Sequence, residues 1–123
     1  MKNREILVVD DDKITLRTLE HILKREGFTV IPLSLGREAV KVAKERSPVL
    51  IILDIMMPDM DGGDVASILK NDPQTKNIPV IFLSSLVTKK EEQSSSKADG
   101  IYFLAKPFER EDLLEKISCF LPA

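Results

Sequence analysis

Three acidic residues follow two strongly apolar runs of the chain. Asp54 ends the run that begins at residue 49, and Asp10 and Asp11 follow the run over residues 6–9. Carboxylates that lie close together repel one another, because a neighbouring charge of the same sign disfavours the ionised form. A divalent metal with oxygen ligands is the simplest way to balance them. The sequence therefore predicts a site for a hard cation at the ends of these runs.

A positive charge follows a third apolar segment. Lys106 stands directly after residues 101–105 and directly before Pro107. If this segment is a strand of the same sheet, its ammonium group faces the same crevice as the acids. A cation and an ammonium group together can neutralise the oxygens of a phosphoryl group. We therefore expect a metal-assisted phosphoryl site.

The composition is that of one globular domain. The chain has 123 residues, 43% hydrophobic and 31% charged, with a formal net charge of −2, and we assign residues 1–123 to a single domain. The eighteen basic residues are outnumbered by twenty acidic ones and form no long basic run, which disfavours nucleic-acid binding. The N-terminus is typical of neither a signal peptide nor a membrane span. A single cysteine, Cys119, permits no internal disulfide. We expect a cytoplasmic protein that does not bind membranes.

Strand-length apolar runs alternate with helical periodicity along the chain. The expected strands are residues 5–9, 28–33, 49–54, 79–84 and 101–105. The first, third and fourth carry apolar runs, which is typical of parallel strands buried on both faces. Pro32 removes a hydrogen-bond donor from the second strand, which therefore belongs at an edge of the sheet. The alternation predicts a doubly wound α/β sheet, in which sites form at the carboxyl ends of the strands.

Four apolar stripes at helical spacing predict helices. Their members are Leu16, Leu19, Ile22 and Leu23; Ala39, Val40 and Ala43; Val65, Ile68 and Leu69; and Leu113, Leu114, Ile117, Phe120 and Leu121. A further helix is expected to begin at a capping box, Thr88 to Glu91. Residues 92–97 offer almost nothing apolar to bury. Because helices in proteins are held by tertiary packing, we expect this helix to be short and loosely held.

The chain resembles the receiver domain of two-component response regulators over its whole length. The features that carry the resemblance occur in the family's order: Asp10-Asp11, Asp54, Met57-Pro58, Asp61-Gly62, Ser84-Ser85 and Lys106-Pro107-Phe108. Each feature alone is weak evidence for the family. Their order and spacing on alternating strands and helices together argue against a chance match. The resemblance implies a flavodoxin-like fold, a five-stranded parallel sheet in the order 2-1-3-4-5 flanked by five helices.

The resemblance also implies a role for each acid. Asp54 would be the phosphoacceptor, whose carboxylate attacks a phosphoryl donor and forms an acyl phosphate. Asp10 and Asp11 would hold Mg²⁺, directly or through water, together with Asp54 and the backbone carbonyl of Met56. Asp12, the next acid, is better interpreted as a helix cap than as a ligand.

Three further roles follow from the same resemblance. Lys106 would pair with the phosphoryl group, and its peptide bond to Pro107 would be cis. Ser84 would donate its hydroxyl to a phosphoryl oxygen, although the adjacent Ser85 leaves open which hydroxyl points in. Phe103 would be the aromatic switch residue, and strand alternation places its neighbour Tyr102 on the opposite face. The alternative interpretation is that both are ordinary core or rim aromatics.

Two positions bear on the lifetime of the phosphorylated state. In the family, the residues two beyond the phosphoacceptor and two beyond the hydroxyl residue influence loss of the phosphoryl group. Here these are Met56 and Leu86, and neither side chain can orient a hydrolytic water. We therefore expect a comparatively long-lived acyl phosphate. The single histidine, His21, and Cys119 lie off the apolar stripes, and we expect both at the surface, outside the chemistry.

The function implied is a phosphorylation-driven signalling switch. The donor would be a histidine kinase or a histidine phosphotransfer protein, and the signal would pass to a protein target or to an output domain. The chain would not be an enzyme beyond its own phosphorylation and dephosphorylation. Three alternatives are an aspartyl-phosphate phosphohydrolase, a receiver-like module that is never phosphorylated, and a flavodoxin-like cofactor protein. The last is disfavoured because no phosphate-binding loop rich in Ser, Thr or Gly follows the first strand.

Overall fold

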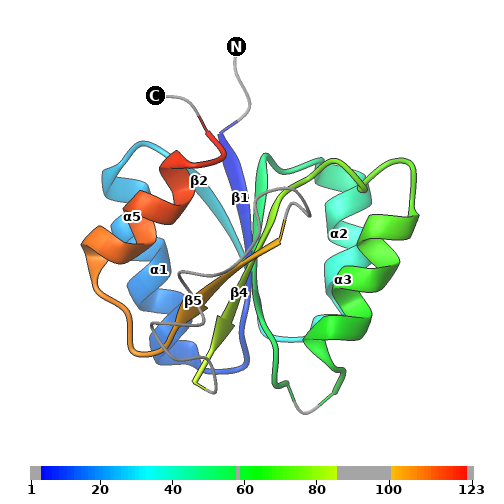
Figure 1. Ribbon diagram of the computed structural model, residues 1–123, viewed down its shortest axis with the longest axis horizontal. Coiled ribbons are helices and arrows are strands. Elements are labelled where there is room, and N and C mark those ends of the chain that lie inside the picture. Colours follow the sequence, from blue (N-terminus) through cyan, green and yellow to red (C-terminus); the bar gives the residue numbers. More distant parts are fainter. Residues whose placement is uncertain (1–3, 58, 86–100, 122–123) are drawn as a thin grey trace.

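Five parallel strands form a single sheet at the centre of the molecule (Figure 1). The computed structural model describes residues 4–57, 59–85 and 101–121. The strands are β1 (Glu5–Val9), β2 (Thr29–Leu33), β3 (Leu50–Asp54), β4 (Val80–Ser84) and β5 (Ile101–Ala105). Their order is β2-β1-β3-β4-β5, which confirms the expected topology.

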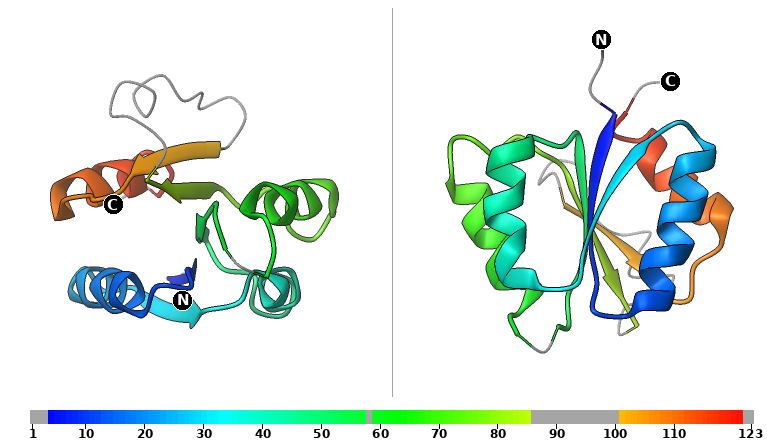
Figure 2. Two further views of the ribbon diagram at one scale, coloured as in Figure 1. Left: turned by 90° about the horizontal axis from the view of Figure 1, so that it is seen from below. Right: turned by 180° about the vertical axis from the view of Figure 1, so that it is seen from behind.

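Helices cover both faces of this sheet (Figures 1 and 2). They are α1 (Lys13–Arg25), the 3₁₀ turn η1 (Gly36–Glu38), α2 (Ala39–Arg46), α3 (Gly62–Asn71) and α5 (Arg110–Ser118). α1 and α5 lie against one face, and α2 and α3 lie against the other. The described residues thus contain four of the five expected α-helices, and the helix expected at residues 88–97 falls outside them. None of the helices described is long and apolar enough to cross a membrane.

The central strands β1, β3 and β4 are buried on both faces, as their apolar runs predict. Within β1, Ile6 and Val8 point to the α1/α5 side, while Leu7 and Val9 point to the α2/α3 side. All four side chains are fully buried. β2 lies at one edge of the sheet, and its Pro32 is exposed, which confirms the edge position expected for this strand.

Local sequence signals explain where the helices begin. The side chain of Asp12 accepts a hydrogen bond from the backbone N–H of Ile14 at 2.9 Å, so Asp12 is the N-cap of α1. α5 begins with a capping box in which Glu109 and Asp112 bond each other's backbone N–H groups. One detail of the expected stripes is wrong. Ile68 is 44% exposed, and α3 buries Ala66 instead, because the helix turns Ile68 outward.

The chain direction determines where a site can form. β1 begins and α5 ends at the same end of the molecule, and the parallel strands run away from that end (Figure 1). The segments that follow β1, β3 and β5 therefore meet at the opposite end. Asp10, Asp54 and Lys106 all lie at this end, since Asp54 is the last residue of β3 and the other two directly follow β1 and β5.

The middle of β3 is a position where the fold is sensitive to a lost side chain. Ile52 is fully buried, and β3 has a strand on either side. We expect Ile52→Ala to lower the free energy of unfolding by about 2–5 kcal/mol, the range for emptying a buried site of this size. Ile31→Ala on the edge strand, where the side chain is half-buried, is the control and should cost clearly less. Urea denaturation measures both, and equal losses would contradict the burial described here.

Candidate functional site

Three carboxylates converge at the carboxyl end of the sheet. Asp10, Asp11 and Asp54 each offer one oxygen, and these oxygens lie within 4.8 Å of one another. Register explains part of this arrangement, because Val9 in β1 pairs with Leu53 in β3, one residue before each acid. Asp10 and Asp54 are buried, whereas Asp11 is exposed. The convergence expected from the sequence is confirmed.

The carboxylate of Asp10 is fully engaged by the protein. Its Oδ1 accepts a hydrogen bond from the backbone N–H of Asp12 at 2.9 Å. Its Oδ2 forms an ion pair with Lys106 Nζ at 2.7 Å. The carboxylate of Asp11 makes no hydrogen bond or ion pair within the part of the chain that the structure describes. Asp11 is therefore the acid most open to a cation, and Asp10 is suited to contact one through water.

Lys106 brings the positive charge to the same place. Its Nζ lies 2.7 Å from Asp10 Oδ2 and 3.5 Å from Asp54 Oδ2, and its backbone N–H donates to the carbonyl of Ser84 at 2.9 Å. Partial burial alone would lower the pKa of Lys106, but the two carboxylates outweigh it and raise this pKa above its usual value. The ammonium group therefore stays charged at neutral pH. The Lys106–Pro107 peptide bond is cis, as expected.

The protonation of Asp54 reflects its crowded surroundings. Burial, and then the negative charge of Asp10, raise the pKa of Asp54 from 3.8 to about 6. The backbone N–H of Met56, which donates to Asp54 Oδ1 at 3.1 Å, and the ammonium of Lys106 act in the opposite direction. Without a cation, the charge on this carboxylate is thus costly. A divalent ion among the three acids would favour the ionised form that a nucleophile needs.

A tight loop holds Asp54 in place from the α3 side. Met56 and Asp61 form an isolated antiparallel bridge, and the N–H of Gly62 donates to the carbonyl of Ile55 at 2.8 Å. A Cβ atom at Gly62 would lie 2.5 Å from the carbonyl oxygen of Asp54 and 2.7 Å from the Cα of Ile55. Only glycine permits this approach of α3 to the strand end. This explains physically why the Asp-Gly pair follows the acid at this distance.

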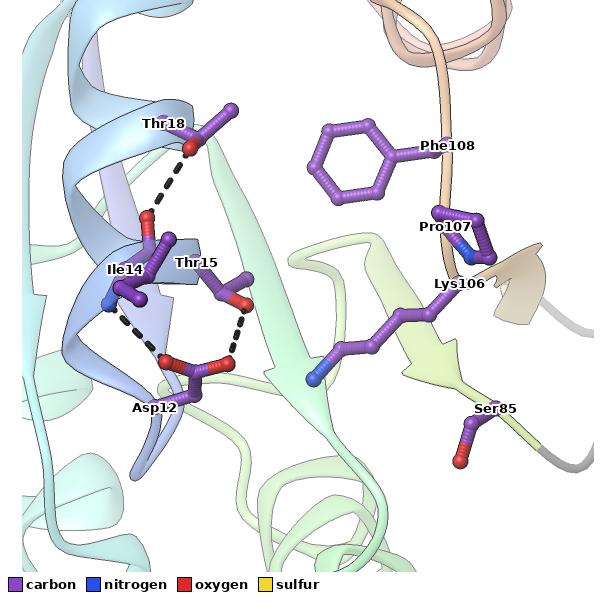
Figure 3. A pocket seen from close by; sticks show the side chains of 8 residues that line it. All are labelled: Asp12, Ile14, Thr15, Thr18, Ser85, Lys106, Pro107 and Phe108. Carbon is purple, nitrogen blue, oxygen red and sulfur yellow. Dashed lines mark hydrogen bonds between the residues drawn. The ribbon is translucent and has the colours of Figure 1, made fainter.

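A pocket of about 370 Å³ opens beside the acids (Figure 3). Its lining residues are Asp12, Ile14, Thr15, Thr18, Ser85, Lys106, Pro107 and Phe108. The carboxylate of Asp12 bonds Ile14 and Thr15 on its own helix, as the dashed lines of Figure 3 show. The interpretation of Asp12 as a cap is therefore confirmed. The apolar wall comes from Ile14, Pro107 and Phe108, which places an open, largely apolar surface next to the charged site.

The hydroxyl and aromatic candidates occupy distinct positions. Ser84 is buried at the end of β4, whereas Ser85 is exposed and lines the pocket with Lys106. Phe103 is half-buried and its ring stacks on that of Phe82, with centroids 5.4 Å apart. Tyr102 faces the other side of the sheet, where it meets Phe120 edge-on. The opposite orientation of the two β5 aromatics is confirmed, while the roles of Ser84 and Phe103 stay predictions.

One polar contact near the site was not predicted from the sequence. The carboxylate of Asp59 accepts hydrogen bonds from the backbone N–H groups of Gly36 and Arg37, both at 3.1 Å. An acid in this loop was visible in the sequence, but its partners lie more than twenty residues away. His21 and Cys119 are exposed, as expected.

Comparison with known proteins assigns the arrangement to a family. The family model described as response regulator receiver domain matches residues 6–118. The chain belongs to the response regulator receiver domain family. This receiver domain is 34% identical over 119 residues to protein PilG of Pseudomonas aeruginosa, covering 97% of this chain and 88% of PilG. It is 26% identical to the polar-differentiation response regulator DivK of Brucella ovis, with 96% of each chain covered.

A solved structure supports the same assignment. The chemotaxis response regulator CheY4 of Vibrio cholerae superimposes with a TM-score of 0.84 at 30% identity, covering 98% of this chain and all of CheY4. The sheet order and the acidic cluster of this receiver domain therefore belong to a family that works in two-component signalling.

The raised pKa of Asp54 predicts a pH-dependent stability of the receiver domain without metal. Because the folded pKa of about 6 exceeds the ordinary 3.8, the contribution of Asp54 to stability is most favourable when this group is protonated and is lost as the pH rises from about 3.8 through about 6. In EDTA at pH 7.5, we expect Asp54→Asn to raise the free energy of unfolding by about 1–2 kcal/mol, after allowance for solvent screening. The gain should shrink towards pH 4.

Urea unfolding at several pH values measures this effect. Glu45→Gln removes an exposed carboxylate near the end of α2, which leads into the start of β3 and so lies at the opposite end of the sheet from the site; this control should show no such gain. A gain for Asp54→Asn that is independent of pH would contradict the assignment of the effect to this titration.

Proposed function

We propose that this receiver domain accepts a phosphoryl group on Asp54 and uses the resulting acyl phosphate as a signalling switch. The observation that supports the proposal most strongly is the convergence of three carboxylates at the carboxyl end of the sheet, two of which contact the Lys106 ammonium group. A structural ion pair needs only one acid for one lysine. The surplus of negative charge is explained if a divalent cation completes the site, and that cation would also bind an oxygen of an incoming phosphoryl group.

The donor set suits Mg²⁺. The ion prefers oxygen ligands, binds through one or two carboxylates together with substrate phosphate, and keeps several waters. Asp11 and Asp54 would hold it directly, Asp10 would contact it through water, and the carbonyl of Met56 would be a further ligand. When bound, the ion would supply positive charge to an oxygen of the incoming phosphoryl group.

The chemistry assigned to the protein is mainly positioning. A carboxylate oxygen of Asp54 attacks phosphorus in line, the bond from phosphorus to the donor atom breaks, and the donor keeps the electron pair. Lys106 neutralises a phosphoryl oxygen, and the Ser84 hydroxyl donates to another. No general base is required, because an ionised carboxylate carries no proton to remove. The proposed reaction therefore depends on charge neutralisation rather than on proton transfer.

The donor that we propose is a phosphohistidine on a histidine kinase or a histidine phosphotransfer protein. Breaking its P–N bond leaves a histidine side chain, so no co-reactant is needed. The output is contact with a protein target or with an attached domain, with Phe103 as the candidate switch residue. Nucleic acid and membranes are not proposed as partners of this domain, and a cytoplasmic location stays a prediction.

The alternative of a phosphohydrolase is less well supported by the residues. Such an enzyme needs a second acid as the acid–base group, and the residue two beyond Asp10, which is Asp12, is occupied as the cap of α1. We therefore expect no turnover of phosphomonoesters. An inert receiver-like module is also less well supported, because every acidic, hydroxyl and lysine position is filled.

Intact-mass spectrometry tests the proposal. Incubation with Mg²⁺ and acetyl phosphate or phosphoramidate should add one phosphoryl group to the wild-type chain, because Asp54 is ionised near neutral pH once a cation is bound. Asp54→Asn and added EDTA should each abolish the gain. Asp64→Asn, an exposed acid in the first turn of α3, is the control and should still be labelled. Labelling of Asp54→Asn to the wild-type extent would refute the assignment.

A second experiment tests the lifetime of the acyl phosphate. The side chain of Met56 is 61% exposed beside Asp54 and is apolar, so it cannot orient an attacking water. We expect Met56→Asn to speed dephosphorylation of the purified protein by about threefold or more, equivalent to about 0.7 kcal/mol of activation free energy. Ile68→Asn replaces an exposed apolar residue of α3 and should leave the rate unchanged. An unchanged rate in Met56→Asn would show that shielding by this side chain is irrelevant. Leu86, the other apolar position, lies outside the described residues.

A further inference from the structure

The loop after β3 is tied to the start of η1 by one carboxylate. Both oxygens of Asp59 are used: Oδ1 accepts from the N–H of Gly36 and Oδ2 from the N–H of Arg37, each at 3.1 Å. These hydrogen bonds, with that from Arg37 the larger cause, hold the pKa of Asp59 below its usual value. The carboxylate is therefore ionised at neutral pH, and bonds to a charged acceptor are the stronger kind.

Apolar contacts accompany this polar clamp. Gly36 is buried, and a Cβ atom at its position would lie 2.9 Å from Cε of Met57 and 3.4 Å from Cβ of Met60. The absence of a side chain at Gly36 thus lets the loop approach η1 closely. Met57 is itself buried among the α2/α3-side core residues. Met57 and Met60, which precede and follow Asp59 in the sequence, therefore lie against the same turn whose N–H groups bond the Asp59 carboxylate.

The same loop carries Met56, and the phosphoacceptor candidate Asp54 stands directly before the loop. The bridge from Met56 to Asp61 and the bond from Gly62 to Ile55 restrict the backbone on either side of Asp59. The N–H of Met56 bonds the Asp54 carboxylate itself at 3.1 Å. Asp59 lies between the two residues that this bridge joins, so a movement of Asp59 would be passed to Met56.

We propose that Asp59 is a positioning residue that couples the cation site to the turn at η1. By clamping the loop, Asp59 holds Met56 where its backbone serves Asp54 and the cation. The coupling is reciprocal, because two linked equilibria change each other by the same factor. A cation bound among Asp10, Asp11 and Asp54 then strengthens the clamp. This inference rests on the proposed function, since it needs a cation at these acids.

Magnesium titration and amide hydrogen exchange test the coupling on the full chain. In the wild type, saturating Mg²⁺ should slow exchange of the Gly36 and Arg37 amides. In Asp59→Ala, the Kd for Mg²⁺ should rise about fivefold or more, the lower end of ordinary coupling between two sites. The slowing of both amides by Mg²⁺ should disappear in this variant. The Kd of Asp59→Asn, which keeps one acceptor oxygen, should lie between those of the wild type and Asp59→Ala.

The control is Asp64→Ala. It removes the same charge from an exposed position in the first turn of α3, next along the chain from the loop, and should keep the wild-type Kd. A merely structural clamp would lower the stability of Asp59→Ala in EDTA and leave its Kd for Mg²⁺ unchanged, and that result would overturn the proposal. If the wild type is phosphorylated normally and only this coupling is absent, the proposed function stands. If the wild type binds no Mg²⁺, the cation site fails and the coupling fails with it.

Discussion

The mutual repulsion of carboxylates at the end of the sheet is the constraint on which the rest of the structure depends. Asp10 and Asp54 are buried side by side, and burial and proximity both disfavour two negative charges. Among the described residues, one ammonium group, that of Lys106, contacts both. One positive charge cannot balance three carboxylates, so this part of the molecule is short of positive charge. A divalent cation, as we propose, would supply it.

The fold holds these charged groups close together. Three separate strands deliver the four groups, and strands β1 and β3 are adjacent while β5 lies two places further along. The long side chain of Lys106 spans the gap over β4. A rigid, fully apolar sheet interior is what keeps the acids from separating, because moving a strand would open a close-packed core. The loop after β3 adds a second restraint through Gly62 and, in our proposal, through Asp59.

The sequence predicted most of this arrangement because the relevant signals are local. Apolar runs such as residues 6–9 and 49–53 identify buried parallel strands, and an acid directly after such a run must lie at a strand end. The resemblance to receiver domains then supplied the strand order and the cis bond at Pro107. The bonds of Asp10 to Lys106 and Asp12, and the pKa of Asp54, could not be predicted in this way, since they depend on distances between side chains.

Two features show where sequence patterns stop being informative. Ile68 fits an apolar stripe but faces outward, because a short stripe does not determine which of two neighbouring positions meets the sheet. The contact of Asp59 with Gly36 and Arg37 joins two loops that no periodicity connects. The expected helix at residues 88–97 lies outside the described residues and stays a prediction.

The most direct measurement of the central claim is a crystal structure of the protein with Mg²⁺ and beryllium trifluoride, which mimics a phosphoryl group on a carboxylate. The account predicts beryllium on Asp54, Mg²⁺ at about 2.0–2.1 Å from oxygens of Asp11 and Asp54, and the Lys106 ammonium turned to a fluorine. Beryllium on another residue, or an ion bound away from these acids, would contradict it.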